Sequence, residues 1–392
     1  MIVGALRELV PGERRVAVVP ATAALLAKAG HRVLVERGAG ASAGFQDSAY
    51  GSAEVLDRGA VLAAAELLAM VRLPCDPRSP EGAIAELGGS GRVLVGMGEP
   101  LSGSPRLAAL AATGATTFAL ELLPRITRAQ SMDVLSSQAT VAGYKAVVLA
   151  ASLLDRMFPM LMTAAGTLAA TRVLVLGAGV AGLQALATAR RLGATTTGYD
   201  IRAAAAEQVR SVGARFLDLG LEAGGEGGGG YARAMDESFY TEQRRRLAAA
   251  CAEHEVVIAT AAVPGRPAPR LVSAEAVRGM PPGGVVIDLA AERGGNCELT
   301  RTRADGAAGE VVEVEGRRVF GPIDLASTVP HHASLMYARN LAAFLQLLAK
   351  AGAPGLVDGV PDPAADEILR DTLLARDGAV ASARARERLP TR

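Results

Sequence analysis

Three glycines, Gly177, Gly179 and Gly182, have the G-x-G-x-x-G spacing, and an acidic residue, Asp200, lies eighteen positions beyond the last of them. In a strand–turn–helix unit the first glycine permits a tight turn, the second lets a pyrophosphate approach the backbone, and the third lets helix and strand pack closely. A carboxylate at Asp200 can then accept hydrogen bonds from the adenosine ribose hydroxyls. The pattern predicts a dinucleotide site that includes Gly177, Ala178, Gly179, Val180, Ala181, Gly182 and Asp200.

The residues around these glycines predict the elements that such a site requires. Residues 173–176 are an apolar run, as expected for a strand buried on both faces. Residues 183–192 have helical character and are followed by Gly193, a common residue after a helix C-terminus. The free N–H groups at the start of this helix would face the phosphates. Residues 195–199 predict the next strand. The alternative that remains is a tight turn between strand and helix that binds no ligand.

The composition limits the classes of function. The chain has 392 residues, enough for two or three domains. Lys and Arg total 41 against 40 Asp and Glu, so no net charge attracts nucleic acid or an anionic membrane. The three cysteines fit no metal or redox spacing and suit a reducing compartment. The charged start of the chain argues against a signal peptide, and we expect no transmembrane helix.

The distribution of predicted elements indicates two α/β domains. Residues 1–135 alternate strands and helical segments, as in a parallel sheet, but contain no glycine triplet. Residues 136–309 are expected to form the dinucleotide domain, and residues from about 310 to 392 to return and complete the first domain. The strands predicted for the first domain are 15–19, 32–36, 67–72, 92–95 and 116–120.

A glycine-rich segment, residues 219–236, interrupts the second domain. So many glycines lose too much conformational entropy on ordering to hold one local structure. One interpretation is a flexible insertion without a role. The other is a mobile loop that closes over the cofactor, with its ordered tip at residues 231–235.

Several further segments resemble one family. The most specific is R-I-T-R-A-Q-S-M-D-V-L-S-S-Q at residues 125–138, and the others are residues 158–167, 222–224, 230–235, 260–269 and 286–298. Together they resemble the soluble NAD(H)-binding domain of the alpha subunit of proton-translocating NAD(P) transhydrogenase, in the family that also contains alanine dehydrogenase. The resemblance implies an α/β fold with two Rossmann-like domains, each with a parallel sheet, separated by a nucleotide-binding cleft.

The resemblance also implies site residues. Its nicotinamide-binding loop falls on Arg125, Gln130, Asp133 and Ser136. A carboxamide needs both a donor and an acceptor, which Gln130 or Ser136 can supply, and Asp133 can hold Arg125 or contact a ribose. The alternative is that Asp133 or Ser136 only caps the following helix. Further cofactor contacts are implied at Gln138, Ile201, Arg202, Gly230, Tyr231, Ala262 and Pro264.

The residues that separate the relatives concern proton transfer. Oxidising an amine or alcohol requires an acid or base, and alanine dehydrogenase uses a lysine and a histidine of its first domain. Arg72 stands at the matching lysine position, and residues 94–100 contain no histidine. A guanidinium is a poor proton shuttle. Direct hydride transfer between two nicotinamides needs no such base. Arg15 is a candidate carboxylate ligand, or simply a partner of Glu13.

The resemblance therefore implies the peripheral NAD(H)-binding subunit of a transhydrogenase, in the cytoplasm on the inner membrane. Membrane-spanning and NADP(H)-binding partner subunits and a homodimer are implied with it. Asp200 favours NAD(H) because its charge would repel a 2′-phosphate, although Arg202 is a residue type that can accept one. An amino-acid dehydrogenase and a non-catalytic NAD(H)-binding protein remain as alternatives. No metal site is expected.

Overall fold

The computed structural model describes residues 1–221, 237–262, 265–302, 309–351 and 366–390. The chain divides into two units, the first made of residues 1–138 and 326–392 and the second of residues 139–325. The chain returns to the first unit later than the sequence indicated. Strands β14 (Val312–Val314) and β15 (Arg317–Phe320) extend the second sheet, because β15 pairs with β13 (Val285–Asp288).

The first unit contains an eight-stranded sheet in the order β17-β16-β6-β5-β4-β1-β2-β3. The six strands from β6 to β3 are parallel, whereas β16 and β17 are antiparallel additions at one edge, so the sheet is mixed and not wholly parallel. The strands are β1 (Ile2–Ala5), β2 (Arg32–Glu36), β3 (Glu54–Leu56), β4 (Leu67–Arg72), β5 (Val93–Met97), β6 (Thr116–Ala119), β16 (Leu373–Arg376) and β17 (Ala379–Val380).

Helices cover both faces of this sheet because its strands present apolar side chains on both sides. In β4, Leu67, Ala69 and Val71 belong to one core, while Leu68 and Met70 belong to the other. The first core is shared with α1 (Pro20–Lys28), α10 (Pro330–Ala351) and α11 (Glu367–Thr372), and the second with α2 (Arg58–Ala64), α3 (Ala83–Leu87), α4 (Arg106–Ala112) and α12 (Ala383–Arg386).

The strand predicted at residues 15–19 is wrong. Val16 to Val19 are buried, but they run beside the sheet without joining it, and Pro20 then starts α1. The Val16 N–H donates to Ser334 Oγ (3.0 Å), and the Val18 carbonyl accepts from the Tyr50 hydroxyl (3.0 Å). The place in the sheet belongs to β1, which pairs with both β2 and β4.

The second unit is a seven-stranded sheet in the order β11-β10-β9-β12-β13-β15-β14, parallel except for β14. The order of its parallel strands is the 3-2-1-4-5-6 arrangement of dinucleotide-binding folds, in which ligands bind where the direction of winding reverses, here between β9 and β12. The other strands of this sheet are β9 (Arg172–Leu176), β10 (Thr195–Tyr199), β11 (Arg215–Phe216) and β12 (Val256–Ala259).

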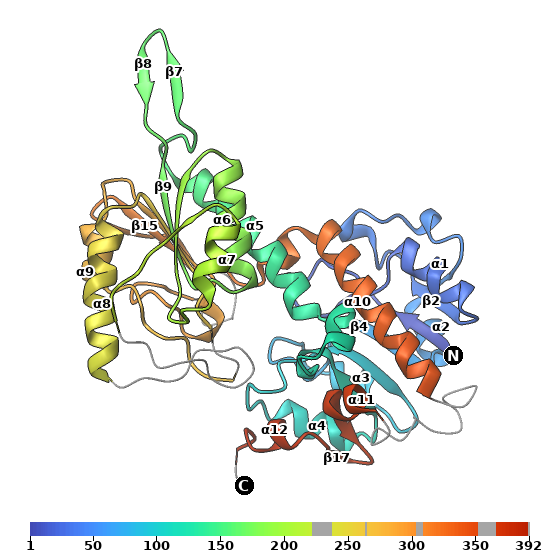
Figure 1. Ribbon diagram of the computed structural model, residues 1–392. Helices are drawn as coiled ribbons and strands as arrows, with labels where there is room; N and C mark the ends of the chain where they lie inside the picture. Colours follow the sequence, from blue (N-terminus) through green and yellow to red (C-terminus); the bar gives the residue numbers. More distant parts are fainter. Residues whose placement is uncertain (222–236, 263–264, 303–308, 352–365, 391–392) are drawn as a thin grey trace. The chain divides into compact units, whose positions relative to one another are not determined.

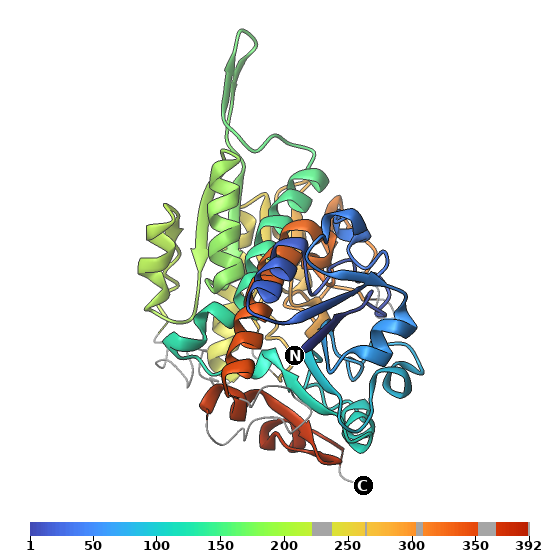
Figure 2. The same ribbon diagram turned by 90° about the vertical axis from the view of Figure 1, so that its right-hand side faces the viewer.

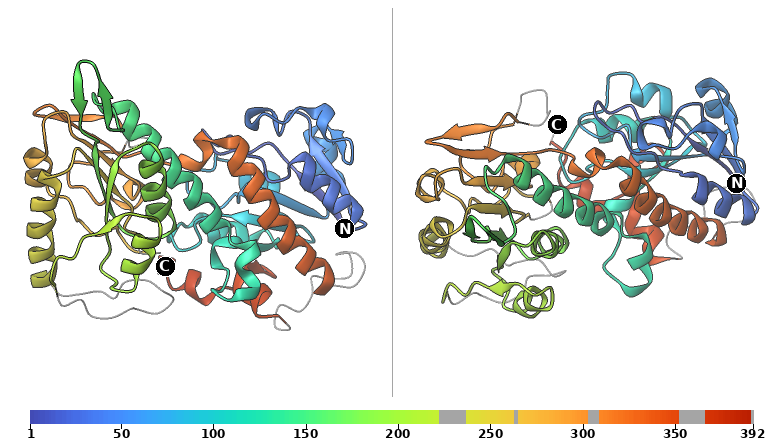
Figure 3. Two further views of the ribbon diagram at one scale, coloured as in Figure 1. Left: turned by 45° about the horizontal axis from the view of Figure 1, so that its top comes forward. Right: turned by 90° about the horizontal axis from the view of Figure 1, so that it is seen from above.

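Two helical layers enclose this sheet, as Figures 1 and 3 show. Helices α5 (Val134–Leu153), α6 (Val180–Arg191) and α7 (Ala205–Ser211) lie on one face, and α8 (Glu237–Ala252) and α9 (Ala274–Gly279) on the other. In β9, Val173 and Val175 pack toward the first layer, and Leu174 and Leu176 toward the second.

A two-stranded hairpin, β7 (Leu161–Thr163) and β8 (Gly166–Leu168), extends away from the second unit (Figures 1 and 2). It pairs with no other described strand. Its apolar side chains face solvent, and Met162 is 77% exposed.

Among the described residues, α5 is the helix whose length and apolar composition would allow it to cross a membrane. Ala146, Val147 and Ala150 of this helix are buried in the second unit. We interpret α5 as a core helix, which has the same length and composition as a membrane span.

Candidate dinucleotide site

The turn between β9 and α6 has the geometry that its three glycines indicated. Gly177 has a φ of 99°, a conformation that other residues rarely adopt. A Cβ on Gly182 would overlap the carbonyl oxygen of Gly177, whereas a Cβ on Gly179 would meet no atom within 4 Å. The first and third glycines are therefore required by the protein itself. The second leaves its space open for a ligand.

The start of α6 suits an anion. Gly179 is the N-cap residue, and no side chain caps the N–H groups of the first turn. Free N–H groups and the positive end of the helix dipole together bind phosphate. At the other end Gly193 has a φ of 90°, and its N–H donates to the Arg190 carbonyl (2.9 Å), which ends the helix as expected.

Asp200 follows β10 and lies beside the glycine turn. Its Oδ2 accepts from the Ala178 N–H (2.8 Å), and its two oxygens also accept from Arg202 Nε and Nη2 (2.9 Å each). Burial by itself would raise the pKa of Asp200, but the hydrogen bonds from Arg202 and Ala178 outweigh burial and hold that pKa below its usual value. The carboxylate is therefore ionised at neutral pH.

The segment after β12 completes this side of the site. Thr260 Oγ1 donates to the Gly177 carbonyl (2.9 Å), so residues 260–262 lie against the glycine turn. Ala262 is exposed there and Ile201 is half-buried. The other expected contacts, Gly230, Tyr231 and Pro264, lie outside the described residues, as does most of the predicted loop 219–236.

The segment of residues 125–138 belongs to the first unit. Arg125 and Gln130 are exposed, and residues 127–132 form a 3-10 turn before α5. Asp133 is the cap of α5: its Oδ1 accepts from the Ser136 N–H (2.9 Å) and its Oδ2 from Ser136 Oγ (2.6 Å). The capping alternative is confirmed for Asp133.

Asn340 anchors this segment, and the sequence did not identify it. Its Nδ2 donates to the Ser131 carbonyl (2.7 Å), and its Oδ1 accepts from Ser137 Oγ (2.5 Å). Because Asn340 lies on α10, about two hundred residues further along the chain, no local pattern could reveal this contact.

Gln138 and Arg15 are internal to the first unit. Arg15 pairs with both oxygens of Glu13 (2.7 and 2.5 Å), and its Nη1 donates to Gln138 Oε1 (2.8 Å). Gln138 Nε2 donates to the Ala333 carbonyl (3.1 Å). The structure therefore gives Arg15 the role of a partner of Glu13. Both amide atoms of Gln138 bond within the protein.

The residues at the alanine dehydrogenase acid–base positions are also held in ion pairs. Arg72 is 8% exposed and pairs with Glu13 (3.3 Å) and Asp76 (3.4 Å). Two buried carboxyl groups in this unit were not identified from the sequence. Burial, together with the charge of Glu13, raises the pKa of Glu8 to about 8. Burial, together with the charge of Glu99, raises the pKa of Glu121 to about 7.

These two acids hold backbone groups. Glu8 accepts from the N–H groups of Val71 and Arg72, and Glu121 Oε1 accepts from those of Gly98 and Glu99. Both fix chain segments at the carboxyl ends of strands in the first sheet. Neither had a recognisable pattern, because isolated glutamates are usually exposed.

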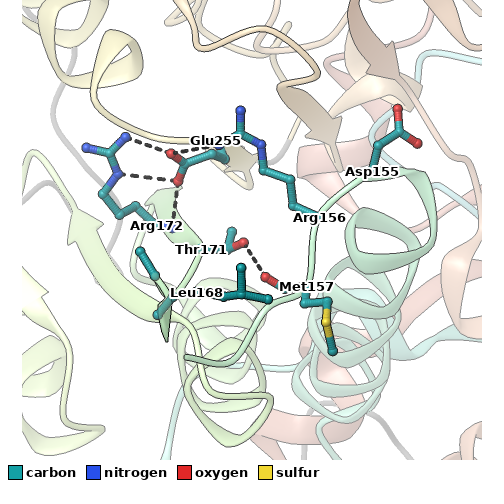
Figure 4. Close-up of a pocket in the computed structure, with 9 residues that line it drawn as sticks. Asp155, Arg156, Met157, Leu168, Thr171, Arg172 and Glu255 are labelled. Atoms are coloured by element: carbon teal, nitrogen blue, oxygen red, sulfur yellow. Dashed lines mark hydrogen bonds and ion pairs between the residues drawn. The ribbon is translucent and has the colours of Figure 1, made fainter. Parts of the chain in front are cut away.

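A cavity of about 620 Å³ lies at the base of the hairpin and is drawn in Figure 4. Arg172 and Glu255 form a two-bond ion pair along it, with Arg172 Nη2 and Glu255 Oε1 2.6 Å apart. Arg172 begins β9 and Glu255 precedes β12, so the cavity is at the amino end of the sheet. Nucleotides bind at the carboxyl end, and we do not assign the cofactor to this cavity.

The fold and the glycine turn define a dinucleotide-binding protein with two Rossmann-like units. The sequence matches the N-terminal domain of the alanine dehydrogenase/PNT family over residues 4–142 and the C-terminal domain of the same family over residues 146–383. The chain belongs to this family.

Individual relatives place it more narrowly. It is 40% identical to the first of the separately encoded pieces of NAD(P) transhydrogenase subunit alpha in Rhodospirillum rubrum, over 95% of this chain and 96% of that one. A crystal structure of transhydrogenase from Sinorhizobium meliloti has a TM-score of 0.83 at 42% identity and covers 97% of this chain and 100% of that one. Alanine dehydrogenase of Mycolicibacterium smegmatis is 30% identical over 77% of this chain and 75% of its own. The chain is a transhydrogenase alpha-type oxidoreductase subunit.

Proposed function

We propose that this chain is the NAD(H)-binding peripheral subunit of a proton-translocating NAD(P) transhydrogenase. It would transfer hydride between NADH and NADP⁺ bound on a partner subunit, while a membrane subunit couples the transfer to proton movement. The observation that carries the proposal is the combination of a complete dinucleotide turn with paired, buried residues at the acid–base positions of the dehydrogenase relatives. A bound NADH supplies the hydride, so no side chain has to accept a proton from the reacting carbon.

The preference for NAD(H) rests on Asp200. Its carboxylate is ionised and anchored by the Ala178 N–H, so a ribose 2′-hydroxyl can donate to it while a 2′-phosphate would be repelled. The Arg202 guanidinium is held against this carboxylate, and we infer that it supports the ribose contact and does not bind a phosphate.

The nicotinamide end of the cofactor would be bound by the first unit. Gln130 is exposed and offers both a donor and an acceptor to a carboxamide. Asp133 and Ser136 are joined to each other and begin α5, and Asn340 ties the same segment to α10. This rigid support suits direct transfer, in which the chain has only to hold one ring in place and exclude water.

We also propose that the protein is a homodimer. An isolated two-stranded hairpin is marginally stable in water, and β7–β8 exposes Met160, Met162 and Leu168. A second copy of the chain would bury these side chains.

The test is hydride exchange. The chain is mixed with an NADP(H)-binding transhydrogenase subunit from a relative, and transfer from NADH to an NADP⁺ analogue is followed spectroscopically. Exchange that requires both proteins is the expected result. Absence of exchange at saturating cofactor, with a native transhydrogenase alpha subunit as the positive control, would contradict the proposal.

The second candidate is an amino-acid dehydrogenase, favoured by the shared family. It requires NADH formation from alanine or a similar amino acid without a partner. We expect no turnover, because the Arg15 and Arg72 guanidiniums are both paired with Glu13. Turnover with any amino acid would make this second function the correct one.

A further inference from the structure

A buried asparagine links the two loops that flank the cofactor side of the second unit. Asn296 is 0% exposed, and its Nδ2 donates to the carbonyl oxygens of Ala261 and Pro269, both at 2.8 Å. These two residues lie on either side of Ala262, next to the glycine turn. One amide group therefore joins the beginning and the end of the loop that follows β12.

The orientation of this amide is determined by its surroundings. If oxygen and nitrogen were exchanged, the side-chain oxygen would face two carbonyl oxygens and no donor. With the nitrogen so placed, Oδ1 is buried without a hydrogen-bond partner. An unsatisfied buried acceptor opposes folding. The side chain therefore contributes through its two donated bonds, and a fully apolar side chain would avoid the cost of Oδ1 but release the loop.

The turn that presents Asn296 is itself rigid. Asp288, at the end of β13, accepts from the Cys297 N–H (2.9 Å) and from Thr300 Oγ1 (2.6 Å). Gly295 has a φ of 83°, and a Cβ there would lie 2.6 Å from Asp288 Oδ2. The Asn296 carbonyl in addition accepts from the N–H groups of Leu271 and Val272.

The loop held by this amide lies against the dinucleotide turn. Thr260 Oγ1 donates to the Gly177 carbonyl, and a Cβ on Gly177 would be 3.1 Å from the Ala261 nitrogen. A shift of Ala261 would therefore change the space available beside Gly177 and Gly179.

We propose that Asn296 is a positioning residue for cofactor binding: it holds the loop after β12 against the glycine turn and sets the affinity for the dinucleotide without touching it. The proposal rests on the proposed NAD(H) site and adds a residue that determines its shape. It predicts an effect on affinity and none on the rate at saturation.

The experiment compares Asn296→Ala with Ser273→Ala in the full chain. Ser273 caps α9 in the same unit, since its Oγ accepts from the Ala276 N–H (3.0 Å), so its loss provides a control for general destabilisation. NADH and ADP-ribose affinities are measured by titration, and hydride exchange is measured at saturating NADH. We expect Asn296→Ala to raise both dissociation constants about tenfold, with exchange at saturation unchanged, and Ser273→Ala to leave all three near the wild-type values.

A second variant, Asn296→Asp, has the same shape but cannot donate when ionised. Its affinity for NADH, relative to wild type at each pH, should recover as the pH falls and the carboxyl group regains one donor. The comparison with wild type at each pH removes contributions from Asp288, Arg270 and Arg293, which lie on the same two loops.

Each remaining result has one meaning. Wild-type NADH affinity in Asn296→Ala, or a loss no greater than in Ser273→Ala, would overturn the inference. Failure of both Asn296 variants to fold would overturn it as well, because the amide would then build the whole unit. Wild-type protein that binds no NADH would instead contradict the proposed function.

Discussion

Asp133 has two possible duties that a single residue can combine. Its carboxylate caps α5 through Ser136, and by the proposed function it also lies at the nicotinamide end of the cofactor. A cap needs only an acceptor, which an amide also provides, whereas a contact to the cofactor depends on charge. The two duties can therefore be separated by substitution.

We expect Asp133→Asn and Gln130→Ala to slow hydride exchange about tenfold or more while the affinity for ADP-ribose stays near the wild-type value. Asp133→Ala should in addition lower the free energy of unfolding by about 1 kcal/mol through loss of the cap. Exchange kinetics and denaturant unfolding measure the two effects. Equal losses of binding and rate in Asp133→Asn and Gln130→Ala would mean that these residues only shape the loop.

Glu121 predicts a dependence of stability on pH. Burial, together with the charge of Glu99, raises its pKa from 4.5 to about 7, so the folded state binds this proton more tightly than the unfolded state. The resulting stabilisation is complete below pH 4.5 and is lost as the pH rises through about 7. The loss can reach about 3 kcal/mol at pH 8.5.

Glu121→Gln removes this titration. The glutamine oxygen can still accept from the N–H groups of Gly98 and Glu99, which both bond to Oε1 in the wild type. The unfolding free energy of the variant should therefore rise relative to wild type between pH 5 and pH 8.5. Glu81→Gln, at an exposed position of the same unit, is the control. A constant difference across this range would show that Glu121 is ionised throughout.

At the scale of elements, the glycine turn separates folding from binding. Gly177 and Gly182 are needed for the close approach of β9 and α6, whereas Gly179 has a negative φ of −77° and open space where a Cβ would be. The turn should thus tolerate a methyl group at residue 179 and lose only its ligand.

We expect Gly179→Ala to have a free energy of unfolding within about 1 kcal/mol of wild type and to bind NADH at least tenfold more weakly, because the methyl group occupies the space for the pyrophosphate. Gly59→Ala, also with no atom within 4 Å of its Cβ but in α2 of the first unit, should leave binding unaltered. Calorimetric titration and thermal unfolding measure both variants. Full NADH affinity in Gly179→Ala would place the pyrophosphate elsewhere.

At the scale of the whole molecule, the hairpin β7–β8 has no described neighbour to cover its apolar side chains. We expect Met162→Lys to convert the protein from dimer to monomer at micromolar concentration without loss of thermal stability, because Met162 is 77% exposed. Light scattering after size exclusion measures the mass. Leu25→Lys, at another exposed apolar position, should remain a dimer. A monomeric wild type would contradict the homodimer.

The sequence predicted most of the elements, and it failed where two segments had equal claims. Residues 15–19 and β1 are both short apolar runs, and only the contacts with β2 and β4 select β1 for the sheet. Likewise β15 could follow either sheet until its pairing with β13 is known. Strand pairing depends on partners distant in the sequence, and no local pattern contains that information.

By itself the amino-acid sequence determined the strand, glycine turn, helix, strand and acid from residue 172 to residue 200, since each depends on side chains within a few positions. The tertiary structure decided which side chains support that turn. Asn296, Asn340 and Glu121 act on loops far from them in the chain. Hydrogen bonds of this kind form only when folding brings buried donors and acceptors together, because an unpaired polar group in the interior is costly.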